Sequence, residues 1–260
     1  MKEEMTRRRW IADRWTETSA MLLDAQATHL ARVLRAQPGQ EFDIVAGNTV
    51  RRGVIERVDP DAVEFSLHEE VEAAESLPLV VALSIVRFER MEWAIEKLTE
   101  LGVSQIVPLI AQRSEKHLVQ ASMKRKDRWR KIARESAQQS RRNSIPEICD
   151  PISIRECVAA MPDALRFLLS EQERIQSLRE SLLTTEAQAT PSRPIYVAIG
   201  PEGGWTPIEL ITFADSGWRS VSLGSHILRT ETAAIVATGV VMTWWSDSEN
   251  ATSGESPRAI

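Results

Sequence analysis

The spacing of apolar residues divides the chain into an N-terminal part and a longer C-terminal part. In the N-terminal part apolar runs are short, and Val63, Phe65 and Leu67 alternate with polar residues. A period of two is typical of strands with one buried face. We predict strands at 41–45, 50–58 and 62–67 and a helix at 25–35, separated by turn residues. Residues 1–72 are therefore predicted to form a compact β-barrel or sandwich with one helix.

Beyond this point the pattern changes to long apolar runs that alternate with helical stripes. Residues 79–86 are almost continuously apolar, as in a strand buried on both faces. Further strands are predicted at 103–111, 165–169 and 195–199, and helices at 90–101, at 122–142 and from a capping box formed by Ser153 and Glu156. This alternation predicts an α/β domain with a mostly parallel sheet over residues 73–246. The polar residues 247–260 are predicted to be a disordered tail.

Two loops within 199–233 carry residue types that suit ligand binding. The first, at 200–204, has three glycines in five positions, so backbone groups can come close to a ligand. A helix then starts with Thr206 as the N-cap, Pro207 in the first turn and Glu209 able to complete a capping box. The second loop follows a short strand at 220–223 and opens a long apolar helix. Both loops follow strands, where open α/β sheets bind their ligands.

The glycine-rich loop does not fit the common phosphate-binding motifs. It lacks the Lys-Ser/Thr pair of a P-loop and the spacing of a dinucleotide fold. Glu202 would repel phosphate, but it could accept hydrogen bonds from ribose hydroxyls or tolerate a cationic ligand. Alternatively, its charge only complements the positive end of the following helix. Spacing alone predicts a small ligand that need not be anionic.

Composition adds limits on compartment and metal content. With 43% hydrophobic and 27% charged residues, the 260-residue chain is typical of soluble globular proteins. It has neither a signal peptide nor an apolar run of about 18 residues, so we expect a cytoplasmic protein without a membrane partner. Cys149 and Cys157 are the only cysteines and have no partnering histidine, so we expect no metal site.

The net charge of −5 conceals a basic segment. Between Arg113 and Arg142 there are eleven Lys or Arg against three acids. Such a segment can bind a phosphate backbone, or it can be a solvated helix face. Arginines of the N-terminal part could extend a basic surface. The candidate RNA contacts are Arg9, Arg32, Arg35, Lys124, Arg128 and Arg142.

Two separated motifs resemble those of one enzyme family. They are IGPEGG at 199–204 and ILRTETA at 227–233. Together with HLARVLR at 29–35 and ELGV at 100–103 they resemble the RsmE family, the small-subunit (16S) ribosomal RNA uridine N3-methyltransferases of the SPOUT superfamily. The resemblance extends over nearly the whole chain. Either motif alone would be a weak signal, but the pair at this separation is specific.

The resemblance implies a fold, a cofactor and partners that spacing does not. It implies a PUA-like N-terminal RNA-binding domain, a methyltransferase domain with a trefoil knot, a homodimer, a small-subunit ribosomal RNA substrate and S-adenosylmethionine as methyl donor. Three loops would hold this cofactor. They comprise Leu169, Ser170 and Glu171, then Ile199, Gly200, Pro201, Glu202, Gly203 and Gly204, and then Leu223, Gly224, Ile227, Leu228, Thr230, Thr232 and Ala233.

Methylation at uracil N3 requires loss of the N3 proton, so stabilisation of anionic uracil oxygens is the expected task of the protein. Arg229 is the candidate for this task, and a structural ion pair with Glu231 or Glu202 is the alternative for that residue. Glu231 is a candidate base, although an acid at a helix start is also routine. Gln138, Arg141 and Ser170 depart from the residues common in relatives.

Two other functions stay open at this stage. One is a non-catalytic RNA-binding protein built from the basic helix and the barrel. The other is a SPOUT methyltransferase that acts on another RNA or on a ribose 2′-hydroxyl. The N-terminal motif and ILRTETA favour the N3-uridine group, whereas the fold alone does not decide among these activities.

Overall fold

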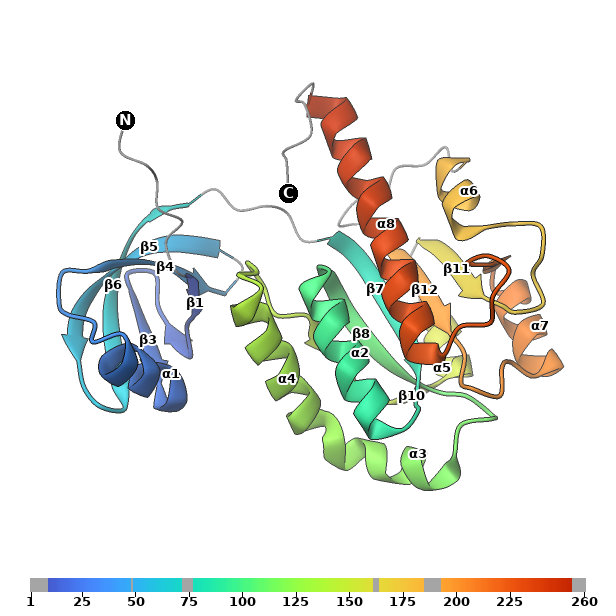
Figure 1. Cartoon of the computed structure of the whole chain (residues 1–260), viewed down its shortest axis with the longest axis horizontal. Coiled ribbons are helices and arrows are strands. Elements are labelled where there is room, and N and C mark those ends of the chain that lie inside the picture. Colours follow the sequence, from blue (N-terminus) through green and yellow to red (C-terminus); the bar gives the residue numbers. More distant parts are fainter. Residues whose placement is uncertain (1–8, 48, 72–76, 161–163, 185–192, 254–260) are drawn as a thin grey trace. The chain divides into compact units, whose positions relative to one another are not determined.

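The computed structural model describes residues 9–47, 49–71, 77–160, 164–184 and 193–253. The chain forms two compact units (Figure 1). The first contains Met1–Glu75 and Ala137–Ser144, and the second contains Ser76–Ser136 and Ile145–Ile260. Among the described residues, no helix has the length and apolarity that crossing a membrane requires. The predicted domain boundary at 72/73 stays a prediction.

The first unit is built on a curled six-stranded sheet. Its order is β1-β4-β5-β6-β3-β2, with β1 parallel to β4 and the other pairs antiparallel. The strands are β1 (Arg9–Ile11), β2 (Arg14–Trp15), β3 (Ser19–Leu23), β4 (Glu41–Ala46), β5 (Thr49–Val58) and β6 (Ala62–Glu70). As the alternation predicts, Val63, Phe65 and Leu67 are buried. They pack in one core with Leu22, Leu30, Ile44 and Ile55.

The helix predicted at 25–35 starts as a regular α-helix and has a wider end. It begins as α1 (Asp24–Thr28) and continues as a π-turn over His29–Val33. The amide of Leu34 donates to the carbonyl of His29 at 3.1 Å, which is the i to i+5 bond of a π-turn. Arg35 then takes a left-handed conformation, with φ of 50°, and ends the helix. Apolar spacing does not distinguish these helical types.

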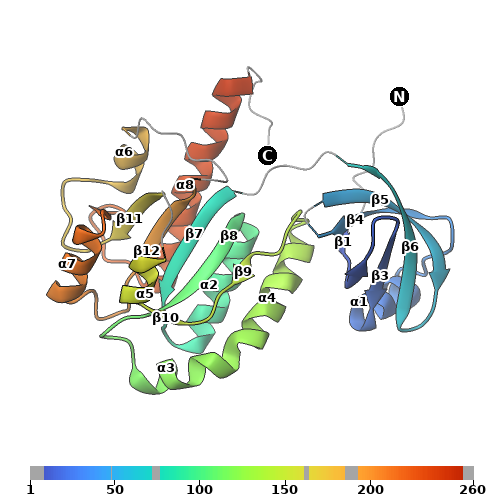
Figure 2. The same cartoon turned by 180° about the vertical axis from the view of Figure 1, so that it is seen from behind.

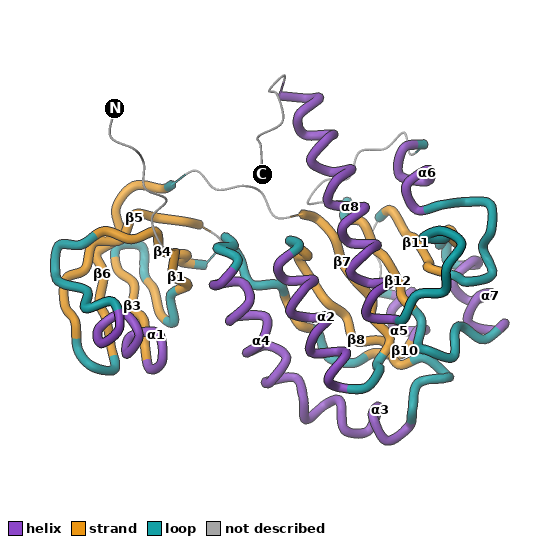
Figure 3. Tube along the Cα trace, viewed as in Figure 1, coloured by secondary structure: helices purple, strands orange, loops and turns teal. Residues whose placement is uncertain are grey.

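The second unit is a parallel sheet with helices on both faces. Its order is β10-β8-β7-β12-β11-β13, with β9 beside β8. The strands are β7 (Leu77–Ser84), β8 (Val103–Ile110), β9 (Glu147–Ile148), β10 (Ile152–Ser153), β11 (Leu165–Leu169), β12 (Ile195–Ile199) and β13 (Arg219–Val221). The helices are α2 (Phe88–Glu100), α3 (Lys116–Ser122), α4 (Lys126–Gln139), α5 (Ile154–Ala159), α6 (Leu178–Leu183), α7 (Pro207–Asp215) and α8 (Thr230–Ser253). Figure 3 shows the alternation. The predicted α/β fold class is confirmed, and the trefoil knot stays a prediction.

Strand β7 shows why both faces of this sheet are apolar. Leu79, Val81 and Leu83 belong to the core beneath α2, α4, α6 and α8. Val80 and Ala82 belong to the core beneath α5 and α7, on the opposite face. Figures 1 and 2 show the two faces. Since successive residues of a strand point to opposite faces, a strand covered by helices on both sides has to be apolar throughout.

Two predicted segments differ from the structure by several residues. The basic helix predicted at 122–142 is α3, a 3-10 turn over Met123–Arg125 and then α4, which ends at Gln139. Arg141 takes φ of 55°, a left-handed conformation that stops a helix. The segment predicted as a tail from residue 247 begins inside α8, which runs to Ser253. An established helix extends at little cost, because each further residue adds a hydrogen bond without a new nucleus. Residues 254–260 lie outside the described residues.

An aromatic group fixes α7 to the sheet. The ring of Phe213 is fully buried, with its centroid 5.1 Å from that of Trp205 and 5.0 Å from that of Trp218. Both pairs are edge-to-face, the geometry that aromatic rings favour. Phe213 therefore supports the residue that follows the glycine-rich loop.

We predict that Phe213→Ala lowers the free energy of unfolding by about 3–5 kcal/mol, because it leaves a cavity among rigid rings. Urea denaturation measures this change. Ile211→Ala is the matched control, since Ile211 lies on the same helix and is 59% exposed. Its free energy should change by less than about 0.5 kcal/mol. Equal losses in the two variants would contradict the structural role given to Phe213.

Candidate active site

A cavity of about 150 Å³ lies at the carboxyl ends of three neighbouring strands. β12 pairs in parallel with β11, and β11 pairs in parallel with β13, so Ile199, Leu169 and Val221 end at one edge of the sheet. The loops after these strands line the cavity. The lining residues are 169–174, 199–202, Gly204, Trp205, Leu210, 221–228, Thr230 and Ala233. The structure thus brings together the three loops that the sequence motifs predict.

Four of the predicted site residues do not line this cavity. They are Gly203, Arg229, Glu231 and Thr232. Gly203 faces Arg113, whose Nη1 donates to the Gly203 carbonyl at 2.6 Å. Arg229 is exposed, whereas Glu231 is buried. The remaining fourteen predicted cofactor residues contribute to the lining.

Trp205 joins the first two loops of the cavity. Its indole Nε1 donates to the carbonyl of Leu169 at 2.8 Å, and both groups are buried. Its ring also packs against Gly200, where an added Cβ would lie 3.1 Å from Trp205 Cε2. Gly200 therefore allows a close approach that a larger residue would hinder. Sequence reasoning missed Trp205, although an aromatic residue between a glycine-rich loop and a capping box was visible.

The backbone conformation of residue 204 favours glycine, and the carboxylate of Glu171 lies close to it. Its φ is +68°, and an added Cβ would lie 2.8 Å from Glu171 Oε1. The first condition disfavours residues with a side chain, and the second excludes one without movement of Glu171. Glu171 belongs to the first loop, so a side chain at position 204 would displace the carboxylate of that loop.

The third loop is tied to the second by Thr230. Its hydroxyl donates to the Gly200 carbonyl at 2.9 Å, and the residue is 4% exposed. Thr230 is the first residue of α8, so the start of this helix is fixed to the glycine-rich loop. The three loops form one bonded unit rather than three independent segments.

The predicted capping box at the start of α7 is confirmed. Thr206 accepts from the amide of Glu209, and Glu209 Oε2 accepts from the amide of Thr206 at 2.7 Å. The other oxygen, Glu209 Oε1, accepts from the amide of Gln112 at 2.7 Å. The cap therefore also fixes α7 to the segment after β8. The capping box of Ser153 and Glu156 is likewise confirmed.

Acidic residues give the cavity a negative side. Glu171, Glu173 and Glu202 line it, together with Arg174 and His226. Hydrogen bonds from the amides of Gln176 and Ile175 lower the pKa of Glu173 and keep it ionised. Carboxylates at these positions favour a cationic ligand and disfavour a phosphate.

Arg229 has no ion pair with either acid that the sequence suggested. Both acids instead form ion pairs with Arg90 of α2. Its Nη1 donates to Glu202 Oε1, and its Nε lies 3.7 Å from Glu231 Oε1. Within the described part of the chain, the Arg229 guanidinium has neither a hydrogen bond nor an ion pair. An exposed, unpaired cation at the start of α8 is available to a ligand.

Comparison with known proteins decides the family. A model described as an RNA methyltransferase domain matches residues 73–242, and one described as an RNA methyltransferase PUA domain matches residues 22–67. The ribosomal RNA small subunit methyltransferase E of Mycobacterium bovis is 34% identical over 226 residues, which cover 82% of each chain. The chain belongs to the ribosomal RNA small subunit methyltransferase E family. The predicted family and the PUA-like N-terminal domain are confirmed.

Further members of this methyltransferase family agree. The Synechocystis relative of the same name is 33% identical over 85% of this chain and 72% of its own length. The crystal structure of the Neisseria gonorrhoeae enzyme bound to S-adenosylmethionine has a TM-score of 0.76 at 28% identity, covering 93% of this chain and 99% of that one. A probable rRNA methyltransferase of Porphyromonas gingivalis has a TM-score of 0.77 at 29% identity, with the same coverage.

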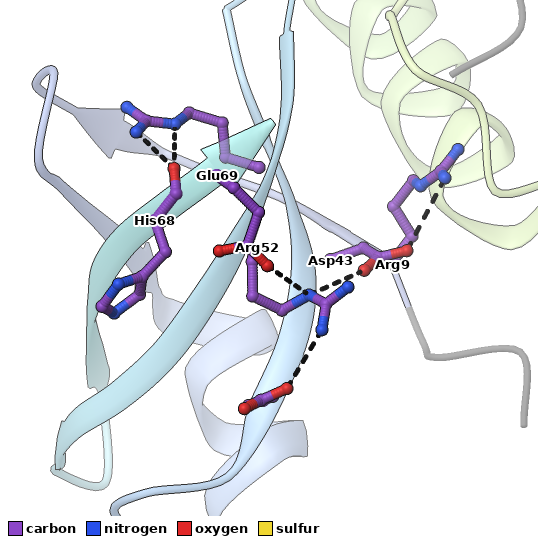
Figure 4. A network of polar contacts seen from close by, with 7 residues as sticks. Arg9, Asp43, Arg52, His68 and Glu69 are labelled. Carbon is purple, nitrogen blue, oxygen red and sulfur yellow. Dashed lines mark hydrogen bonds and ion pairs between the residues drawn. The ribbon is translucent and has the colours of Figure 1, made fainter. Parts of the chain in front are cut away.

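Within the first unit, the predicted RNA contacts of this family member differ in availability. Arg9 is held by Asp43 at 3.7 Å (Figure 4). It also donates to the carbonyl of Arg141 at 2.9 Å. Burial lowers the pKa of Arg142 to about 10. Arg32 and Arg35 are exposed, and their side chains have no hydrogen bond or ion pair among the described residues.

The neighbouring Arg52 is also engaged in ion pairs with acids of the same unit. It lies 3.1 Å from Glu41, 4.0 Å from Asp43 and 4.0 Å from Glu69 (Figure 4). Gln138, one of the departures from the family pattern, donates to Gln26 Oε1 in the same unit. Part of the basic surface that arginines of the N-terminal part could form is thus neutralised.

In the second unit the two predicted RNA contacts, Arg128 and Lys124, also differ in their availability to RNA. Arg128 donates two hydrogen bonds to Glu92, from Nε to Oε1 at 2.6 Å and from Nη2 to Oε2 at 2.7 Å. Lys124 is exposed and unpaired as far as the structure describes the chain. The alternative to phosphate binding, a solvated helix face with ion pairs within the protein, therefore describes Arg128 better than Lys124.

The cysteines lie away from the cavity lining. Burial raises the pKa of Cys149 to about 11 and that of Cys157 to about 12, so both thiols stay protonated near neutral pH. In the described ranges, no cluster of three or more His, Cys, Asp or Glu side chains is arranged to hold a metal ion.

Proposed function

We propose that this protein transfers a methyl group from S-adenosylmethionine to N3 of a uridine in small-subunit ribosomal RNA. The observation that carries the proposal is the cavity formed where three loops meet at one edge of a parallel sheet. Membership of the methyltransferase E family supports the reaction and the RNA class. The free Arg229 at the cavity edge supports the chemistry.

The residues of the cavity fit S-adenosylmethionine. Leu169, Ile199 and Leu223 provide apolar walls for an adenine ring, and the backbone of the glycine-bearing loops provides donors and acceptors. The carboxylate of Glu171 suits a sulfonium cation, and that of Glu202, which pairs with Arg90, can accept hydrogen bonds from ribose hydroxyls. When bound, the cofactor supplies the methyl group. The proposed contacts are Leu169, Ser170, Glu171, Ile199, Gly200, Pro201, Glu202, Gly204, Leu223, Gly224, Ile227, Leu228, Thr230 and Ala233. Gly203 lies outside the lining and is held there by Arg113, and Thr232 also lies outside the lining.

Arg229 has the position to stabilise charge on the uracil. Loss of the N3 proton spreads negative charge to the neighbouring carbonyl oxygens, and a guanidinium can donate hydrogen bonds to them. Arg229 lies between two lining residues, Leu228 and Thr230. Glu231 stays the candidate base by residue type, but its burial and its ion pair with Arg90 favour a structural task.

RNA binding is assigned to residues 1–72 and to exposed cations of the chain. Arg32, Arg35 and Lys124 are the strongest contacts, because their charges are not neutralised. Arg9, Arg128 and Arg142 would have to give up protein contacts or emerge from burial to bind phosphate. Methyl transfer is assigned to residues 73–246, and a ribosomal substrate supports a cytoplasmic location.

We also propose a homodimer. Ile227, Val236 and Met242 are large apolar residues on the third loop and α8, with exposures of 84%, 38% and 37%. Covering them in a second copy of the chain would remove apolar surface from water. Sedimentation equilibrium at micromolar concentration tests this assignment, and a monomer would contradict it.

The substrate is tested in cells. A strain lacking this protein should have no 3-methyluridine at the substrate position of its small-subunit ribosomal RNA, and reintroduction of the gene should restore the nucleoside. Nucleoside mass analysis of purified small-subunit RNA measures both states. Retention of 3-methyluridine in the deletion strain would contradict the proposed substrate.

Arg229→Ala tests the proposed charge stabilisation. We expect turnover to fall by about 10²–10³-fold, as for the loss of a donor to a developing anion, while the affinity for S-adenosylmethionine changes little. Calorimetry and single-turnover methylation separate the two effects. Arg155→Ala, which removes an exposed arginine of α5, is the control and should keep full turnover. Normal methylation by Arg229→Ala would refute the assignment.

Arg32 and Arg35 are tested by salt dependence. The double change to Gln should weaken binding of a small-subunit RNA fragment and reduce the slope of log K against log salt by about one to two. Arg57→Gln is the matched control, because Arg57 is exposed in the same unit but lies 2.6 Å from Asp59. An unchanged slope in the double variant would place the RNA elsewhere.

A further inference from the structure

Arg90 joins two loops of the site without lining the cavity. It lies in the first turn of α2, and its guanidinium contacts Glu202 of the glycine-rich loop and Glu231 at the start of α8. Neither the family motifs nor the pattern of apolar residues singles out its side chain. Arg90 is absent from the residues that line the cavity, and its guanidinium is connected to the lining through Glu202.

The charges of this group leave Glu231 dependent on Arg90. One cation faces two carboxylates, and Glu231 is 5% exposed. One of its oxygens, Oε2, is buried and has no hydrogen-bond partner among the described residues. The position of Glu231 in the first turn of α8 is favourable for an acid, but it does not replace a paired cation. Removing one partner of a buried ion pair leaves an uncompensated charge.

The same group controls where the cofactor loops lie. Glu202 lines the cavity, and Glu231 is flanked by Thr230, whose hydroxyl holds the Gly200 carbonyl. The second loop and the start of α8 are thus joined twice, by the Thr230 bond and by Arg90. Without the guanidinium, Glu202 and Glu231 would repel each other across this junction.

We propose that Arg90 is a positioning residue that holds the glycine-rich loop against the start of α8 by neutralising Glu202 and Glu231, and so keeps the S-adenosylmethionine pocket formed. The inference rests on the proposed function only in its choice of ligand. It assigns Glu231 a structural charge rather than proton transfer. It also separates Arg90 from Arg113, which holds the same loop through the carbonyls of Gly203 and Trp205.

The test is a set of variants of the full chain, with S-adenosylmethionine affinity measured by calorimetry. Arg90→Gln should weaken binding by about tenfold, in the usual range for coupled sites. In the double variant Arg90→Gln with Glu231→Gln, the affinity for S-adenosylmethionine should return to within about threefold of that of the parent protein, because the uncompensated charge of Glu231 is gone. Arg90→Lys should bind S-adenosylmethionine with an affinity between those of the parent and Arg90→Gln. Lysine keeps the positive charge, but it lacks the forked guanidinium that contacts both acids. Arg87→Gln, which changes an exposed arginine just before α2, is the control and should bind normally.

A packing role for Arg90 gives a different result. If only its hydrocarbon stem mattered, Glu231→Gln would bring no recovery in the Arg90→Gln background. That result, or normal binding by Arg90→Gln, would overturn the proposal. Urea denaturation of the same variants reads out the coupling without a ligand, and the double variant should unfold at a higher urea concentration than Arg90→Gln. If the parent protein bound no S-adenosylmethionine, the proposed function would fail, whereas the denaturation result would still decide the role of Arg90.

Discussion

The site depends on the parallel pairing of β12, β11 and β13. Parallel neighbours end at the same edge, so the loops after Leu169, Ile199 and Val221 meet without any long connection reaching across the sheet. The sheet is buried on both faces, which fixes its register, and one residue of slip would move apolar side chains to the wrong core. The cavity is therefore as well defined as the pairing of the strands that support it.

Hydrogen bonds from side chains to backbone carbonyls hold these loops together as a pocket. The Trp205 indole, the Thr230 hydroxyl and the Arg113 guanidinium each bind a backbone carbonyl of a loop. The Gly200 and Gly203 carbonyls lie in irregular backbone, where no strand or helix would otherwise satisfy them, and the Leu169 carbonyl lies at the end of β11. The bonds stabilise the loop conformation before a ligand arrives, which lowers the ordering cost of binding. The acids that remain in the lining make the pocket suitable for a cation.

Local features of this site could be predicted from the sequence, whereas long-range partners could not. The capping box of Thr206 and Glu209 follows from residues three apart, and it forms as predicted. The continuously apolar run at 79–86 likewise gave a buried parallel strand. In contrast, Arg90 lies more than a hundred residues from Glu202 and Glu231, and no local pattern connects them. The same limit applies to the basic segment, because the charge count cannot show that Arg128 is taken by Glu92.

The central claim is that the three loops form the S-adenosylmethionine pocket before the cofactor binds. A crystal structure of the protein with S-adenosylmethionine, compared with one of the free protein, tests it most directly. The account predicts the cofactor between Leu169, Ile199 and Leu223, with the backbone of residues 199–205 shifted by less than about 1 Å. A cofactor bound elsewhere, or a rearrangement of this loop by more than about 2 Å, would contradict it.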